Sequence, residues 1–307
     1  MYKELKLRGA LLEAAGLALS LLLLSGVSYG QEGRTILSLP WGKEENQVGL
    51  VNKEEYEVCG PLSFCVDGEA VFLLDSVKQR IIKYEGEGNL GVAAEKVSGC
   101  AVCKDGNGGV FVLSGPRILH IPKTGEKKLQ VTVKASDNPP PIIPGYGNEL
   151  FLDARGNLCL RGVKQNVHRF SGIQAANHPR LQDIGHASLH YKIKRLDGNK
   201  VRLIGADDDG KNLISIPIKL KQGTPGATLF KGMDERGNLY VELECLEEDK
   251  IGLEVHRYSP AGDQPAVFQL PNNYFSTVYK KTEIAGDGSV YQMLTTKEDV
   301  RIIKYSK

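Results

Sequence analysis

The stretch GPLSFCVDGEAVFLLDSVKQRIIKY, residues 60–84, contains three apolar β-type runs separated by two polar breaks. The first break is Asp67 followed by Gly68. An aspartate side chain accepts hydrogen bonds from backbone N–H groups two or three residues on, and glycine adopts the positive φ that a short hairpin requires. The pattern therefore predicts a β-hairpin followed by a third antiparallel strand.

The same turn recurs five more times along the chain. The later copies are centred on Asp105, Asp153, Asp197, Asp234 and Asp287, and steps between neighbouring copies run from 37 to 53 residues. Their mean of about 44 residues is typical of one four-stranded propeller blade. We therefore expect an all-β, six-bladed β-propeller with four-stranded blades, and favour it over a two-sheet sandwich. The six aspartates are interpreted first as turn formers.

The two ends of the chain predict how the ring closes. The last copy ends just after its third strand, residues 301–305, and residues 35–40 precede the first copy without a partner. Pairing residues 35–40 beside residues 300–305 completes the last blade and removes an exposed sheet edge. Trp41 follows that strand, and we expect it to pack at the closure.

With the copies in place, the first one resembles a repeat of NHL-type, TolB-like six-bladed propellers. Residues 71–84, VFLLDSVKQRIIKY, carry the family pattern of a strand ending in aspartate, a short gap, then a basic residue and a strand ending in an aromatic residue. Copies two, three, five and six match the turn and parts of the third strand, and copy four matches only the turn. The resemblance covers about residues 35–307 and implies a fold. Such propellers include sugar-lactone hydrolases, amide lyases, protein-binding modules and exported proteins.

Residues 1–30 have the features of a signal peptide. Lys3, Lys6 and Arg8 precede an apolar run over residues 11–24, and Ser28 and Gly30 are small residues placed for cleavage before Gln31. The apolar run is shorter than the ~20 residues of a spanning helix. We expect residues 1–30 to be removed and residues 31–307 to form one exported, monomeric propeller domain that is periplasmic, cell-surface or secreted.

Charge narrows the classes of partner. With 39 Lys+Arg against 37 Asp+Glu, the formal net charge is +2. Because the positive and negative charges nearly cancel, electrostatics does not favour nucleic acid or an acidic membrane as the main partner of this protein.

Aligning the copies on their aspartates indicates which residues line the central channel. Positions four to eight residues upstream lie on the innermost strands, where propeller ligands usually sit. They give Tyr146, Asn148, Glu149, His190, Lys192 and Glu283, and His186 lies just before the window of the fourth copy. Together these seven residues form a candidate ligand-binding set of mixed charge. This lining suits a protein, a peptide or a small polar ligand. Ordinary solvated channel residues are the alternative interpretation.

We expect an exported binding protein with no catalytic residues, no cofactor and no metal. The alternative is an exported hydrolase or lyase, lactonase-like, that uses a divalent cation such as Ca²⁺ in the channel. Such an enzyme needs several oxygen ligands converging on one ion. Glu149 with Asn148 is the adjacent pair of that kind.

Four cysteines fall at the first two copies: Cys59, Cys65, Cys100 and Cys103. Because exported proteins can form disulfides, one or two bonds joining blade one to blade two are expected. Free buried thiols and a tetrathiolate metal site are the two alternatives.

Overall fold

The computed structural model describes residues 28–29, 32–86, 88–126, 128–132, 149–153, 156–162, 167–174, 189–207, 209–263 and 266–306. These residues form β-strands joined by turns and loops, and they contain no helix. None of them therefore belongs to a helix that is long and apolar enough to cross a membrane.

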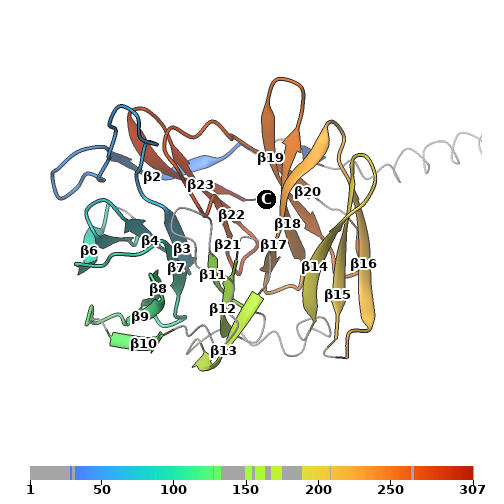
Figure 1. Ribbon diagram of the computed structural model, residues 1–307, viewed down its shortest axis with the longest axis horizontal. Coiled ribbons are helices and arrows are strands. Elements are labelled where there is room, and N and C mark those ends of the chain that lie inside the picture. Colours follow the sequence, from blue (N-terminus) through green and yellow to red (C-terminus); the bar gives the residue numbers. More distant parts are fainter. Residues whose placement is uncertain are drawn as a thin grey trace, which may run out of the picture.

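The strands form six separate sheets, in which consecutive strands pair antiparallel (Figure 1). The first contains β3 (Ser63–Asp67), β4 (Ala70–Asp75), β5 (Arg80–Tyr84) and β6 (Leu90–Glu95). The second contains β7 (Ala101–Lys104), β8 (Val110–Ser114), β9 (Arg117–Ile121) and β10 (Lys128–Thr132), and the third contains β11 (Glu149–Leu152), β12 (Asn157–Arg161) and β13 (Val167–Gln174). The fourth contains β14 (His190–Arg195), β15 (Lys200–Ala206) and β16 (Asn212–Lys219).

The last two sheets include strands from the N-terminal part of the chain. The fifth contains β17 (Thr224–Met233), β18 (Leu239–Leu246), β19 (Ile251–Tyr258) and β20 (Ala266–Leu270), with β1 (Ser28–Tyr29) parallel to β20. The sixth contains β21 (Thr282–Ile284), β22 (Val290–Thr295), β23 (Asp299–Tyr305) and β2 (Arg34–Pro40). Cleavage after Gly30 would therefore remove β1 and leave β2 in place.

The repeated aspartates form turns, as the sequence predicted. Asp105 accepts a hydrogen bond from the Gly109 backbone N–H at 2.8 Å, and Asp153 and Asp234 accept from the residue four positions on, both at 2.9 Å. Gly68 has φ +61° in the first turn, a conformation that strongly favours glycine. Two copies differ. Asp67 accepts a hydrogen bond from the Gly108 backbone N–H of the second turn at 3.1 Å, and the Asp197 side chain forms no hydrogen bond with a described residue.

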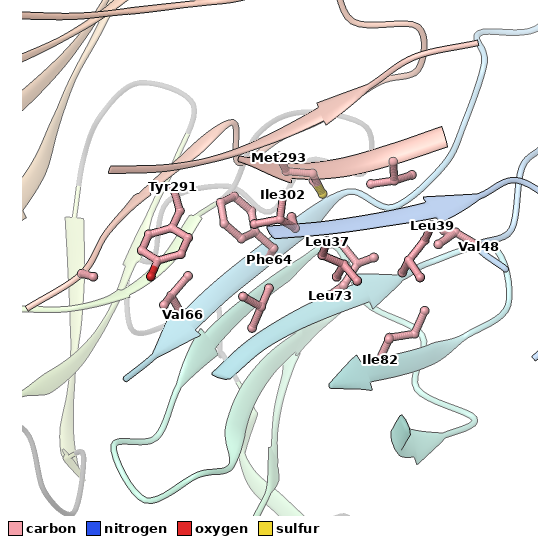
Figure 2. Close-up of a cluster of buried hydrophobic side chains, with 13 residues drawn as sticks. Leu37, Leu39, Val48, Phe64, Val66, Leu73, Ile82, Tyr291, Met293 and Ile302 are labelled. Atoms are coloured by element: carbon pink, nitrogen blue, oxygen red, sulfur yellow. The ribbon is translucent and has the colours of Figure 1, made fainter. Parts of the chain in front are cut away.

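The expected pairing of the two chain ends is present in the structure. Strand β2 pairs antiparallel with β23, with Leu37 opposite Ile302 and Leu39 opposite Val300. Figure 2 shows these leucines packed with buried residues of the first and sixth sheets. The Trp41 indole donates a hydrogen bond to the Thr296 carbonyl at 3.0 Å, so it packs at this junction as predicted.

Neighbouring sheets pack through buried apolar clusters. One cluster joins the sixth and first sheets, and others join the first to the second, the second to the third, the fourth to the fifth and the fifth to the sixth. In the described part of the chain no such cluster joins the third sheet to the fourth. Meandering sheets packed face to face in this way form a propeller-type arrangement, and six sheets exclude the two-sheet sandwich.

The expectation of four strands in every sheet is wrong for the fourth sheet. Within the described residues it contains β14, β15 and β16 alone, because residues 220–223 lead directly from β16 into β17. The third sheet has three strands within the described residues, and residues 175–188 lie outside them.

Candidate functional site

A cavity of about 1170 Å³ lies where the first strands of the six sheets meet. Its wall includes residues of β3, β7, β11, β14, β17 and β21, together with turns that follow these strands. Figure 1 places β3, β7, β11, β17 and β21 around the middle of the molecule. Two further strands of the third sheet, β12 and β13, also line it, so the cavity extends along the face of that sheet.

Glu149, at the start of β11, is held by two cations. Its Oε2 lies 2.5 Å from Arg161 Nη1 and its Oε1 lies 2.8 Å from Lys231 Nζ. Burial alone raises the pKa of this carboxyl, but Lys231, Arg161 and Lys280 together lower it to about 2. Glu149 is therefore ionised at neutral pH, and both of its oxygens are occupied.

A second ion pair lies beside the first. Lys280 Nζ is 2.5 Å from Glu283 Oε2, and only 4% of the Lys280 side chain is exposed. Burial lowers the pKa of Lys280, but the carboxylates of Glu283 and Glu149 outweigh it, so the pKa is raised and the ammonium stays protonated. The two pairs together hold three cations and two carboxylates.

One wall of the cavity is apolar and aromatic. The rings of Tyr191 and Phe230 stack with centroids 4.3 Å apart, and Met233 Sδ lies 4.0 Å from the Tyr191 hydroxyl oxygen. On the third sheet the Arg161 guanidinium lies 4.5 Å from the centroid of the Phe151 ring. Charged and aromatic groups thus face one space, as in sites that bind small molecules.

Four of the candidate residues named from the sequence line this cavity: Glu149, His190, Lys192 and Glu283. The other three, Tyr146, Asn148 and His186, lie outside the described residues. The alignment missed the two residues that hold Glu149. Lys231 lies three residues before its aspartate, one position short of the window, and Arg161 lies on the second strand of its sheet.

The alignment placed the cavity too far upstream in the first two sheets. Residues 59–63 and 97–101 do not line it, whereas Asp67, Gly68, Glu69, Cys103 and Lys104 do. There the wall is formed by the turn and by the end of the innermost strand.

The predicted disulfides are wrong, because all six cysteines are free thiols. Cys65 packs between the first and second sheets, and Cys103 packs between the second and third. Each precedes its turn aspartate by two residues, so the two cysteines occupy equivalent positions in neighbouring sheets. Both thiols therefore point toward the next sheet in chain order and not toward each other. Packed sheets lie ~10 Å apart, whereas the Cβ atoms of a disulfide lie ~3.8 Å apart.

The other two cysteines of this group form hydrogen bonds of their own. Cys59 Sγ donates to the Glu57 carbonyl at 3.3 Å, and Cys100 Sγ lies 3.8 Å from the Leu113 carbonyl. Burial raises the pKa of Cys100 to about 11 and that of Cys103 to about 12, so neither is a thiolate at neutral pH. The alternative of free thiols is confirmed.

The described residues do not fit a divalent cation. A calcium ion needs carboxylate and carbonyl oxygens that converge on it. Cations occupy both oxygens of Glu149, and Lys280 holds Glu283. Within the described ranges no three His, Cys, Asp or Glu side chains are grouped to hold a metal ion. We derive no chemistry through such an ion.

No protein-family model matches this chain. No curated protein matches it either. Similar solved structures include regucalcin, a calcium-binding protein from Agrobacterium tumefaciens, at 14% identity and a TM-score of 0.48, covering 92% of this chain and 95% of that one. A gluconolactonase from Xanthomonas campestris has 10% identity and a TM-score of 0.44, covering 90% of this chain and 100% of that one.

Virginiamycin B lyase from Staphylococcus aureus has 11% identity and a TM-score of 0.39, covering 82% of this chain and 97% of that one. All three TM-scores are below 0.5 and all identities are below 15%, so these activities are not carried over to this chain.

Proposed function

We propose that this chain is an exported, monomeric six-bladed propeller whose central cavity binds a small polar ligand with an apolar part, without catalysis. In this proposal residues 1–30 are a cleaved signal and residues 31–307 form one domain. The protein is then periplasmic, cell-surface or secreted. The observation that carries the proposal is the cavity of about 1170 Å³ lined by the first strands of all six sheets.

Contacts between the innermost strands support six blades. Strand β7 lies beside both β3 and β11, β21 lies beside β3 and β17, and β14 lies beside β17. Pairing of β2 with β23 supplies the outermost strand of the last blade from the start of the domain. A ring joined in this way has one seam, between the third and fourth sheets, where the described residues form no apolar cluster and the cavity lies instead.

The lining supports the class of ligand. Buried ion pairs fix charged groups at one part of the wall, and the stacked pair Tyr191 and Phe230 offers a flat apolar surface at another. Lys104 and Lys192 line the cavity and form no ion pair with a described residue. A small molecule with an anionic or hydroxyl-rich end and a planar or branched body matches this distribution.

A cation-dependent hydrolase or lyase is the second candidate, because Glu149 and Glu283 line the same cavity. Against it stands the occupation of Glu149 by Lys231 and Arg161, which a metal ion has to displace. Breaking such buried pairs costs about 3–5 kcal/mol.

The test is a thermal-shift screen of residues 31–307 with a panel of sugar acids, sugar lactones and dipeptides. We expect at least one compound to raise the melting temperature. Lys192→Ala should weaken that shift, whereas Lys194→Ala, on the same strand but outside the cavity wall, should leave it unchanged.

The same screen separates the two functions. Lactone hydrolysis that requires added Ca²⁺ and stops with a chelator would replace the binding proposal by the enzyme. A panel in which no compound shifts the melting temperature, or in which Lys194→Ala acts as strongly as Lys192→Ala, would overturn the cavity as the site.

A further inference from the structure

We propose that one face of the fourth sheet, which adjoins the central cavity, binds an anionic polysaccharide. Five cations lie on this face: Lys192, Lys194, Lys200, Arg202 and Lys219. We call it the cationic face. Figure 1 shows the sheet, β14 to β16, at the side of the molecule.

Alternation along the three strands defines the two sides of this sheet. On one side Ile193, Leu203 and Ile216 pack against the fifth sheet. On the other side the five cations are all exposed. The packed side is an ordinary sheet-to-sheet contact, and the cationic face has no apolar cluster with the third sheet among the described residues.

Charges on this face repel one another. Lys194 lies directly opposite Arg202 on the neighbouring strand, and Lys200 lies directly opposite Lys219. Like charges directly opposite each other destabilise a sheet, by a few tenths of a kcal/mol to about 1 kcal/mol per pair. The sheet thus carries two repulsive pairs that a bound polyanion relieves.

No group of the described chain neutralises this face. The strands β14, β15 and β16 contain no aspartate or glutamate. None of the five cations forms a hydrogen bond or ion pair with a described residue. The overall net charge of +2 therefore does not show that positive charge is concentrated on this one face.

Shape and composition favour a polysaccharide among polyanions. Alternate residues of a strand lie ~6.6 Å apart on one face, and neighbouring strands lie ~4.8 Å apart, which gives a flat grid of charges for an extended polymer. Four of the five cations are lysines, and the face carries no Phe, Tyr or Trp ring for stacking nucleic-acid bases, its one aromatic ring among the described residues being the imidazole of His190 at the start of β14.

The position of the face argues against a membrane surface. Lys192 belongs both to the cationic face and to the wall of the cavity, and β13 of the third sheet lines that same cavity. A single polymer chain can enter between two sheets, whereas a flat bilayer cannot follow it there.

The test compares two double charge reversals in the mature protein. Arg202→Glu with Lys219→Glu removes two cations from the face and turns both repulsive pairs into attractive ones, so this variant should fold at least as stably as wild type. Lys53→Glu with Lys297→Glu changes the net charge equally at exposed sites away from the face. Binding to heparin and to polygalacturonate is measured at fixed salt, with neutral dextran as the blank.

We expect wild type and the Lys53, Lys297 variant to bind both polymers alike, and the Arg202, Lys219 variant to bind about tenfold to a hundredfold more weakly. Heparin should raise the melting temperature of wild type and not that of the Arg202, Lys219 variant. Equal losses in both variants would reduce the effect to net charge and overturn the proposal. Tighter binding of oligo-dT, polyglutamate or anionic vesicles than of either polysaccharide would overturn the class of partner.

Discussion

At the scale of single residues, Glu149 shows how a charged side chain is stabilised at a buried position in the cavity wall. Its side chain is 12% exposed and lies against Lys231 and Arg161, whose side chains are 3% and 10% exposed. Ionised groups so deeply buried persist only when they are paired. The arrangement fixes three strands, β11, β12 and β17, relative to one another around the cavity.

The lowered pKa of Glu149 determines how the stability of the fold changes with pH. Its folded pKa of about 2 lies below the ordinary value of 4.5, so its ionisation stabilises the fold above pH 4.5, and this contribution disappears as the pH falls toward 2. The shift corresponds to roughly 3 kcal/mol. Urea unfolding at pH 6 should show Glu149→Gln less stable than wild type by about that amount, and the difference should shrink steadily between pH 4.5 and pH 2.5.

Glu69→Gln is the matched control, because Glu69 lines the same cavity but is exposed and unpaired. It should change stability by less than ~0.5 kcal/mol at either pH. A Glu149→Gln deficit that stays constant down to pH 2.5 would mean that the lost stability comes from packing and not from charge.

Sequence alignment could place Glu149 and Glu283 at the cavity, since both precede a turn aspartate by four residues. It could not find Arg161, because the partner of a first-strand residue is set by the register of the hairpin, in which Glu149 lies opposite Arg161. Nor could it predict that Cys65 and Cys103 pack in different seams between sheets. Residues two before the aspartate are equivalent in every sheet, and equivalent residues point toward successive seams.

At the scale of elements, β2 could be predicted because residues 35–40 and residues 300–305 each lacked a partner strand in the repeat pattern. Among the described residues, β2 has no partner in the first sheet, and β23 is the last strand of the sixth sheet in chain order. The fourth sheet was less predictable, since its copy matches only the turn and the described residues supply no fourth strand. Local turn chemistry thus predicted where hairpins form, and it did not predict how many strands follow each hairpin.

Strand β2 should contribute much of the stability of the sixth sheet. It buries Leu37 and Leu39 at 8% and 3% exposure, and Ser38 donates a hydrogen bond to Asp299 at 2.6 Å. Deleting residues 31–42 should cost more than the ~2–5 kcal/mol expected for truncating one buried leucine. Urea unfolding of chains that begin at residue 31, 34 or 43 measures this.

The chain that begins at residue 34 keeps β2 and serves as the control, so it should match the mature protein. Adding a peptide of residues 31–42 to the shortest chain should recover part of its melting temperature, since the exposed edge of β23 is then paired again. Equal stability of all three chains would refute the closure role of β2.

At the scale of the whole molecule, the described residues make one seam of the proposed ring, between the third and fourth sheets, different from the other five. Five seams hold apolar clusters, and along this one the cavity wall includes Val167 and Arg169 of β13 beside His190 and Lys192 of β14. Apolar burial is the main favourable term in joining sheets, at about 25 cal/mol per Å². A ring of this kind therefore opens first where that term is smallest.

Native-state hydrogen exchange tests this at residues matched for burial. Leu203 in β15 and Met293 in β22 are both 0% exposed. Each lies in a strand with a neighbour on both sides, since β15 pairs with β14 and β16, and β22 pairs with β21 and β23. We expect amides of β15 to exchange through openings of lower free energy than amides of β22, although each of these strands is paired on both sides. A compound or polymer that occupies the cavity or the cationic face should slow exchange in β14 and β15 and leave β22 unchanged. Equal protection of the two sheets in the free protein would mean that the seam is as firmly joined as the rest, and that ligands enter along the axis of the ring instead of between its third and fourth sheets.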